Sequence, residues 1–226
     1  MLKYRLVPTA VRDEDFFQEV DETFSNPNKM REVTRPIVPL AIADGQQAMK
    51  VVRQRAPQWG LVPDRIGIMG FSAGGHLAST AGIHFDSGNA SPADPIDRFS
   101  CRPDFMILAY PVISFTAPYT HQGSATNLLG ENADPKLRAE LSSELHVTAQ
   151  TPPTFLFSTD ADTAVPPENT VAFYLALRKA GVPAEMHVFE KGPHGVGLDL
   201  DDPALGQWPT LLANWLRSRG LLHSQK

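Results

Sequence analysis

Residues 66–77 read Ile-Gly-Ile-Met-Gly-Phe-Ser-Ala-Gly-Gly-His-Leu. The first five form a short apolar run typical of a buried strand, and helix-forming residues follow from Ala73 to about Ile83. The five residues from Gly70 to Gly74 fit the pattern G-x-S-x-G, in which a sharp strand-to-helix turn lifts a serine hydroxyl above a sheet. We expect this turn to admit only small residues beside the serine and to point the Ala73 N–H at one spot in space. Because the pattern also occurs by chance, Ser72 needs support from the rest of the chain.

Strands and helices alternate along the remaining sequence. Further buried strands are predicted at 105–110 and 154–158, and residues 184–189 alternate as a fourth strand. Helices are predicted at 13–25, 40–56, 135–144, 167–180 and 204–219, with mostly loop over 84–103 and 114–133. Residues 2–7 alternate like a short strand. This order predicts one α/β domain over residues 1–226, a three-layer sandwich with a mostly parallel sheet whose sites lie at the carboxyl ends of the strands.

Two later strand ends supply the partners that a serine nucleophile needs. Asp160 and Asp162 follow the predicted strand at 154–158, and His194 follows the one at 184–189. The order Ser, Asp, His is the one that this architecture uses. A histidine can take the serine proton and later give it to a leaving alcohol, while an aspartate fixes its tautomer. Asp162 is the preferred aspartate because it directly precedes a Thr-Ala-Val-Pro turn, and Asp160 stays open as a turn or capping residue.

Composition excludes several classes of partner. A formal net charge of −5 argues against nucleic acid and anionic membranes, because both need a basic face. The single Cys101 excludes an internal disulfide, and no apolar run is long enough to span a bilayer. The first residues lack the apolar segment of a signal peptide, so we expect a cytoplasmic protein. His76 is expected to serve packing, and no histidine has ligand-like spacing to acidic residues, so we expect no metal and no cofactor.

These motifs resemble the α/β-hydrolases, in particular small bacterial carboxylesterases of the acetyl-xylan and feruloyl esterase type. The matching stretches are 64–77, 151–155, 165–169, 176–183 and 192–198. The resemblance implies hydrolysis of small esters through an acyl-serine, with Ser72 as nucleophile, His194 as base and Asp162 as the orienting acid. Ala73 would supply an oxyanion-hole N–H. The implied substrates are short-chain acyl esters, with acetylated or aromatic sugar esters among them.

The N-terminal part departs from this family. Relatives of this type carry a His-Gly-Gly-Gly or Pro-Gly-Gly-Gly loop that supplies part of the oxyanion hole, and this sequence contains neither. Residues 2–7 resemble a strand that follows that loop, so we expect a gap in the sheet beside the Ser72 strand or a new pairing of residues 2–7. A bare sheet edge invites pairing, which predicts a homo-oligomer through that edge or by strand exchange.

The missing loop also bears on activity. Losing one oxyanion donor lowers the rate by about 10²–10³, so a second hypothesis stays open: a weakly active or inactive hydrolase-fold protein that binds a ligand or partner. Four phenylalanines are candidates for the acyl pocket. Phe16 and Phe17 lie in the segment 8–36, which is expected to form a lid or wall, or a surface helix over bare sheet. Phe71 and Phe115 would line the rest of the pocket, with ordinary loop packing as the alternative.

Overall fold

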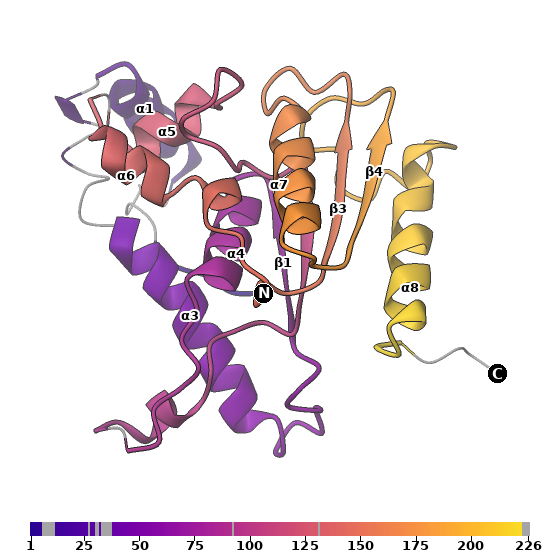
Figure 1. The fold of residues 1–226 in the computed structure, drawn as a ribbon. Coiled ribbons are helices and arrows are strands. Elements are labelled where there is room, and N and C mark those ends of the chain that lie inside the picture. The colour runs from indigo at the N-terminus through magenta and orange to yellow at the C-terminus, as the bar shows by residue number, and fades with distance from the viewer. Residues whose placement is uncertain are drawn as a thin grey trace.

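The computed structural model describes residues 1–5, 12–26, 28–29, 32, 38–91, 93–130 and 132–222 (Figure 1). Within these residues four parallel strands form one sheet in the order β1-β2-β3-β4. The strands are β1 (Gly67–Phe71), β2 (Phe105–Ala109), β3 (Thr154–Thr159) and β4 (Ala184–Phe189). The predicted parallel sheet is therefore confirmed, and its strand bounds agree closely with the apolar runs of the sequence.

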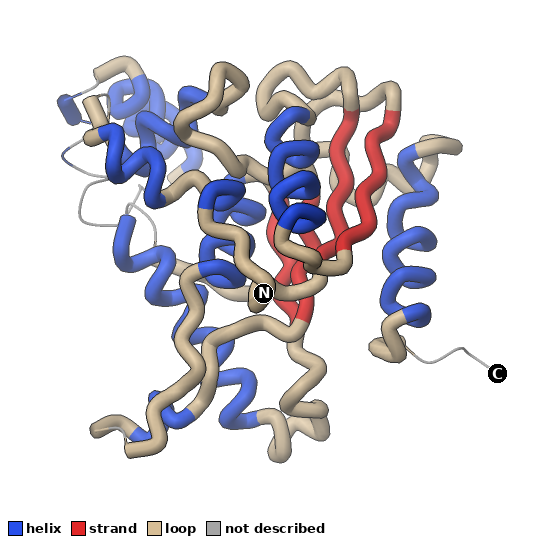
Figure 2. Tube along the Cα trace, viewed as in Figure 1, coloured by secondary structure: helices blue, strands red, loops and turns tan. Residues whose placement is uncertain are grey.

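Helices cover both faces of this sheet, which Figure 2 shows at the centre of the molecule. The helices are α1 (Asp13–Phe24), α3 (Val38–Arg55), α4 (Ala73–Ile83), α5 (Gln122–Leu129), α6 (Pro135–Glu140), α7 (Glu168–Lys179) and α8 (Trp208–Ser218). Short 3-10 turns occur at Pro95–Arg98, Ser143–Leu145 and Leu205–Gln207. Helices α4 and α7 pack on one face, with α3 outside α4, and α8 packs on the other face. None of the described helices has both the length and the apolar character needed to cross a membrane.

The core lies on both sides of the two central strands. Successive side chains of a strand point to opposite faces, so Met106 and Leu108 pack toward α4 and α7 while Ile107 packs toward α8. On the α8 side, the rings of Phe157 and Trp208 stack with their centroids 4.4 Å apart. Burial on both faces explains why β2 and the centre of β3, Phe155–Phe157, are apolar without alternation in the sequence.

Two segments differ from the sequence-based predictions. The strand predicted at 2–7 is wrong for residues 2–5, which pair with no strand, and residues 6 and 7 lie outside the described residues. Instead, Arg5 forms an ion pair with Asp44 of α3 (Nη2 to Oδ1, 2.6 Å). Helix α5 occupies part of the predicted loop at 114–133, because the His121 side chain accepts the Ser124 N–H and caps the first turn.

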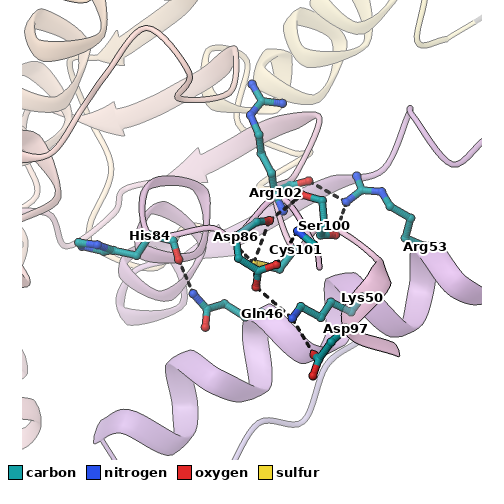
Figure 3. Close-up of polar contacts among 10 residues, drawn as sticks. Gln46, Lys50, Arg53, His84, Asp86, Asp97, Ser100, Cys101 and Arg102 are labelled. Carbon is teal, nitrogen blue, oxygen red and sulfur yellow. Dashed lines mark hydrogen bonds and ion pairs between the residues drawn. The ribbon is translucent and has the colours of Figure 1, made fainter. Parts of the chain in front are cut away.

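A polar network ties α3 to the connection between α4 and β2 (Figure 3). The Lys50 ammonium lies 3.0 Å from Asp86 Oδ2 and 2.9 Å from Asp97 Oδ1. Arg53 pairs with Asp104 at 2.9 Å, and the buried Cys101 lies 3.3 Å from Asp86 Oδ2 through its Sγ. The network fixes the described residues of 84–91 and 93–104 at the amino ends of the strands, away from the edge where sites of this architecture lie.

Candidate active site

Ser72 occupies the turn between β1 and α4 with a left-handed φ of 53°. Its N–H donates to the Ala109 carbonyl at 3.0 Å, and its own carbonyl accepts N–H groups from Gly75, His76 and Val112 at 2.9–3.2 Å. A residue other than glycine in such a conformation carries a strain of about 1–3 kcal/mol. These four hydrogen bonds hold the strained turn and set Ser72 at the carboxyl end of β1.

The glycines of the turn have different surroundings. A Cβ at Gly70 would lie 2.0 Å from the carbonyl oxygen of Gly74, and a Cβ at Gly75 would lie 2.7 Å from Pro111 Cβ. A Cβ at Gly74 would meet nothing within 4 Å. The expectation that only small residues fit beside the serine therefore holds at Gly70 and is wrong at Gly74. The second position that demands a glycine is Gly75, where α4 approaches the end of β2.

The structure brings Ser72, His194 and Asp162 together. His194 Nε2 lies 2.8 Å from Ser72 Oγ, and His194 Nδ1 lies 2.7 Å from Asp162 Oδ2. A carboxylate can only accept a hydrogen bond, so Nδ1 carries the ring proton. Nε2 is then left with a lone pair, which accepts the Ser72 O–H. Ser72 follows β1, Asp162 follows β3 and His194 follows β4, so three separate strand ends converge on one hydrogen-bonded chain.

The two candidate aspartates lie in different environments. Asp162 has a fully buried side chain, and its Oδ1 accepts the N–H groups of Ala164 and Val165 at 3.0 and 2.9 Å. These bonds fix the carboxylate so that Oδ2 faces His194. Asp160 is exposed, and its backbone N–H donates to the Phe189 carbonyl at 2.7 Å. The contact with His194 is therefore made by Asp162, the aspartate that the sequence favoured.

The loop that carries His194 is clamped by two residues that the sequence analysis did not single out. The Tyr110 hydroxyl accepts the Gly197 N–H at 3.2 Å, and Trp208 Nε1 donates to the Gly197 carbonyl at 2.9 Å. The Tyr110 ring also meets the His194 imidazole edge-on, with centroids 5.1 Å apart. Burial raises the pKa of Tyr110, which keeps its hydroxyl neutral. The only signal in the sequence was the position of Tyr110 at the carboxyl end of a predicted strand.

The other predicted residues are spread around this centre. Ala73 is the first residue of α4, so its N–H has no partner within the helix and lies directly beside Ser72. Phe115 is buried and lines a cavity of about 380 Å³. The rest of the lining is Thr116, Ala117, Thr120, Gln122, Pro135 and Arg138. Phe71, half-exposed against Tyr110, and Phe16 and Phe17 on α1 are not among the lining residues. The acyl-pocket role of all four phenylalanines stays a prediction.

Two further histidines lie near these elements. His76 is buried in α4, donates from Nε2 to the Leu141 carbonyl at 2.8 Å, and has its pKa lowered to about 4 by burial. Its ring packs on Phe115, with centroids 4.7 Å apart, so it is a neutral packing residue. His121 caps α5, and burial lowers its pKa, as does the proximity of His194. In the described part of the chain, no three His, Cys, Asp or Glu side chains form a group that could hold a metal ion.

Comparison with known proteins identifies the family. The sequence matches the family BD-FAE over residues 25–177, more than half of the chain. It is 36% identical over 183 residues to an acetylxylan esterase of Xylanibacter ruminicola, covering 79% of this chain and 36% of that protein. It is also 36% identical over 167 residues to an endo-1,4-beta-xylanase B of Butyrivibrio fibrisolvens, covering 74% of this chain and 26% of that protein. The chain thus spans about a third of the length of these curated relatives.

A solved structure agrees with this assignment. The acetyl ester-xyloside bifunctional hydrolase of Caldicellulosiruptor lactoaceticus superposes with a TM-score of 0.80 and 48% sequence identity, over 82% of this chain and 68% of that one. The resemblance inferred from the sequence motifs is therefore confirmed at the level of family and fold. The chain belongs to the BD-FAE family and has the fold of the α/β-hydrolase esterases.

Proposed function

We propose that this protein is a serine carboxylesterase that hydrolyses short-chain acyl esters. The observation that carries the proposal is the hydrogen-bonded chain from Ser72 Oγ through the His194 ring to the buried Asp162 carboxylate. An unassisted serine is a poor nucleophile, and a neighbouring imidazole with a free lone pair is the base that activates it. The names of the relatives, an acetylxylan esterase and an acetyl ester-xyloside hydrolase among them, support acetylated sugars as substrates.

The mechanism follows from the tautomer of His194. Ser72 Oγ attacks the ester carbonyl carbon while Nε2 takes the serine proton, and Asp162 stabilises the imidazolium that forms. The carbonyl oxygen becomes an oxyanion, toward which the Ala73 N–H is placed to donate. His194 then gives the proton to the leaving alcohol, and an acyl-serine remains. In the second half, His194 takes a proton from water, the hydroxide attacks the acyl carbon, and the proton returns to Ser72 Oγ as the acid leaves.

Hydrolysis of p-nitrophenyl acetate by the wild type and by Ser72→Ala tests this function. We expect the substitution to lower kcat by at least about 10³, because it removes the nucleophile and leaves only binding and oxyanion contacts. Ser87→Ala, at an exposed position, is the matched control and should keep the wild-type rate. A fluorophosphonate should label the wild type at Ser72 and should not label the Ser72→Ala protein.

A second candidate, a hydrolase-fold protein that binds a ligand without turning it over, is favoured by one observation. The sequence lacks the glycine-rich loop that would add oxyanion donors to the Ala73 N–H. The same assay separates the two candidates. Equal rates for the wild type and Ser72→Ala, together with no labelling of Ser72, would refute the esterase and leave the binding protein.

A further inference from the structure

Asn169 is a fully buried polar residue in the first turn of α7. Its Oδ1 accepts the N–H groups of Ile113 and Ser114, both at 3.0 Å. Its Nδ2 donates to the carbonyls of Tyr119 and Pro166, both at 3.1 Å. An amide oxygen can accept two hydrogen bonds and an amide nitrogen can donate two, so this side chain uses all of its polar capacity. The reversed amide would set N–H groups against N–H groups, so its partners fix one orientation.

These contacts join the two segments that carry reacting groups. On one side, the Val112 N–H donates to the Ser72 carbonyl at 3.1 Å, and Val112 directly precedes the two residues that Asn169 Oδ1 holds. On the other side, the Asn169 backbone N–H also donates to the Pro166 carbonyl, at 3.0 Å. Pro166 directly follows the turn whose N–H groups hold Asp162 Oδ1. Asn169 therefore lies between the Ser72 turn and the Asp162 loop.

Together the contacts close a ring that includes the reacting side chains. From Ser72 Oγ the ring runs through His194 to Asp162. It continues along the chain to Asn169 and returns to the Ser72 carbonyl through residues 112–114. Strand β2 lies between β1 and β3, so no ladder hydrogen bond sets the distance from Ser72 to Asp162. The segment that follows β2 sets it instead, because it bonds to Ser72 on one side and to Asn169 on the other.

We propose that Asn169 is a positioning residue, which holds the Ser72 turn and the Asp162 loop at the separation at which His194 reaches both. The inference rests on the proposed esterase function. The two nitrogens of one imidazole must contact Ser72 and Asp162 at the same time, and a misplacement of about 1 Å can lower a rate about 10²-fold. The four hydrogen bonds of the Asn169 amide all go to backbone groups, so Asn169 acts through these segments and not on the substrate.

Substitutions that remove different parts of the amide test this role. Asn169→Leu keeps the size of the side chain and opens the ring, so kcat on p-nitrophenyl acetate should fall about 10–100-fold while KM stays near the wild-type value. Asn169→Asp keeps Oδ1, and with it the bonds to Ile113 and Ser114, so it should retain most of the wild-type kcat. Each rate is divided by the number of sites that a fluorophosphonate labels at completion, which removes the effect of any unfolded fraction.

Thr154→Val is the matched control. Thr154 is fully buried at the amino end of β3, where its Oγ1 donates to the Pro152 carbonyl at 2.9 Å. The substitution removes a buried hydrogen bond, as Asn169→Leu does, but at the end of the sheet opposite Ser72. It should lower Tm and leave both kcat and KM unchanged.

A proton NMR spectrum reports on the ring in the absence of substrate. The Nδ1 proton that His194 donates to Asp162 should give a signal far downfield of the backbone amides, and His194→Ala should remove this signal. We expect Asn169→Leu to shift the signal upfield or to broaden it by exchange with water, because the Asp162 loop is released. Thr154→Val should leave the signal in place.

A folded Asn169→Leu protein with the wild-type kcat per labelled site and an unmoved NMR signal would overturn the positioning role. Equal losses of kcat in Asn169→Leu and Asn169→Asp would overturn it as well. If the wild type is no faster than Ser72→Ala, the esterase proposal falls, while the NMR signal still tests whether Asn169 places His194. Should Asn169→Leu not fold, Asn169→Ser, whose smaller side chain leaves room for a water, is the second variant, with changes in the same direction.

Discussion

Gly70 and Gly74 flank Ser72 in the sequence, yet their roles in folding differ. A Cβ at Gly70 would lie 2.0 Å from a backbone oxygen, so Gly70→Ala should destabilise the fold by about 1–3 kcal/mol or more, as overpacking does. Gly74 lies in helix α4, and a Cβ there would meet nothing within 4 Å, so Gly74→Ala should raise the free energy of unfolding by about 0.5–1 kcal/mol. Thermal unfolding of both variants measures the difference. Equal losses of stability would contradict the role assigned to Gly70.

Tyr110 offers a test of how His194 is positioned. Tyr110→Phe keeps the ring beside the imidazole and removes the hydroxyl that accepts the Gly197 N–H. We expect kcat on p-nitrophenyl acetate to fall about tenfold with little change in KM, because one hydrogen bond that orients the base is lost. Tyr174→Phe on α7 removes a hydroxyl elsewhere and is the control that should leave kcat unchanged. A parallel rise in KM would point instead to substrate contact.

His76 makes stability depend on pH. Burial lowers its pKa from the usual 6.5 to about 4, so between these values the unfolded chain binds a proton that the folded chain does not. The free energy of unfolding should therefore fall as the pH drops from about 6.5 to about 4, by about 3 kcal/mol over the whole window. Urea titrations at pH 7 and pH 4.5 measure this slope. His76→Gln, which can still donate to Leu141 and does not titrate, should flatten it.

At the scale of elements, the Lys50 network is expected to keep residues 84–104 against α3. The Lys50 side chain is only 12% exposed, while its partners Asp86 and Asp97 are about half-exposed, so solvent screens part of the attraction. Lys50→Met should lower global stability by only about 1 kcal/mol. It should nevertheless speed the reaction of the buried Cys101 with a thiol reagent severalfold, because the loop above the thiol is released. Lys179→Met, at an exposed position on α7, should leave the labelling rate unchanged.

The sequence predicted those elements whose signal is local. Strand β2 and the centre of β3 are apolar because both faces of the sheet are covered there, β4 alternates, and glycine or proline marks most of the strand ends. Ser72, Asp162 and His194 were found because each follows a predicted strand. Helix α5 was missed because a histidine caps it, and histidine is not a usual N-cap. The strand at 2–7 was predicted from alternation alone, although alternation says nothing about whether a partner strand is available.

Tyr110 illustrates a second reason why part of the site could not be predicted from the sequence. Its hydroxyl acts on Gly197, 87 positions away, and no local pattern announces such a contact. The same holds for Asn169, whose side chain organises the segment 113–119 from the first turn of α7. The reacting groups could be predicted because each follows the end of a strand. The residues that orient them depend on how the loops cross above the sheet. Those crossings become visible only in three dimensions.

At the scale of the whole molecule, β1 forms an edge of the described sheet. The Ser72 N–H bonds to β2, so by alternation the backbone groups of Met69 and Phe71 face away from it. These two residues are 41% and 38% exposed. The homo-oligomer predicted from the sequence stays a prediction, and this edge is its proposed contact. Light scattering over a concentration series should show self-association, which Met69→Lys should weaken. A monodisperse monomer at every concentration would refute it.

Ser72 and His194 follow the two outermost strands of that sheet, yet their side chains are 2.8 Å apart. Three inter-strand spacings separate β1 from β4, a width of about 14 Å, so the loop after β4 must reach back over β3 and β2. The contact between Ser72 and His194 therefore depends on the spacing of all four strands. A core substitution that moves any two neighbouring strands apart should lower the rate of ester hydrolysis, while circular dichroism still shows an intact fold.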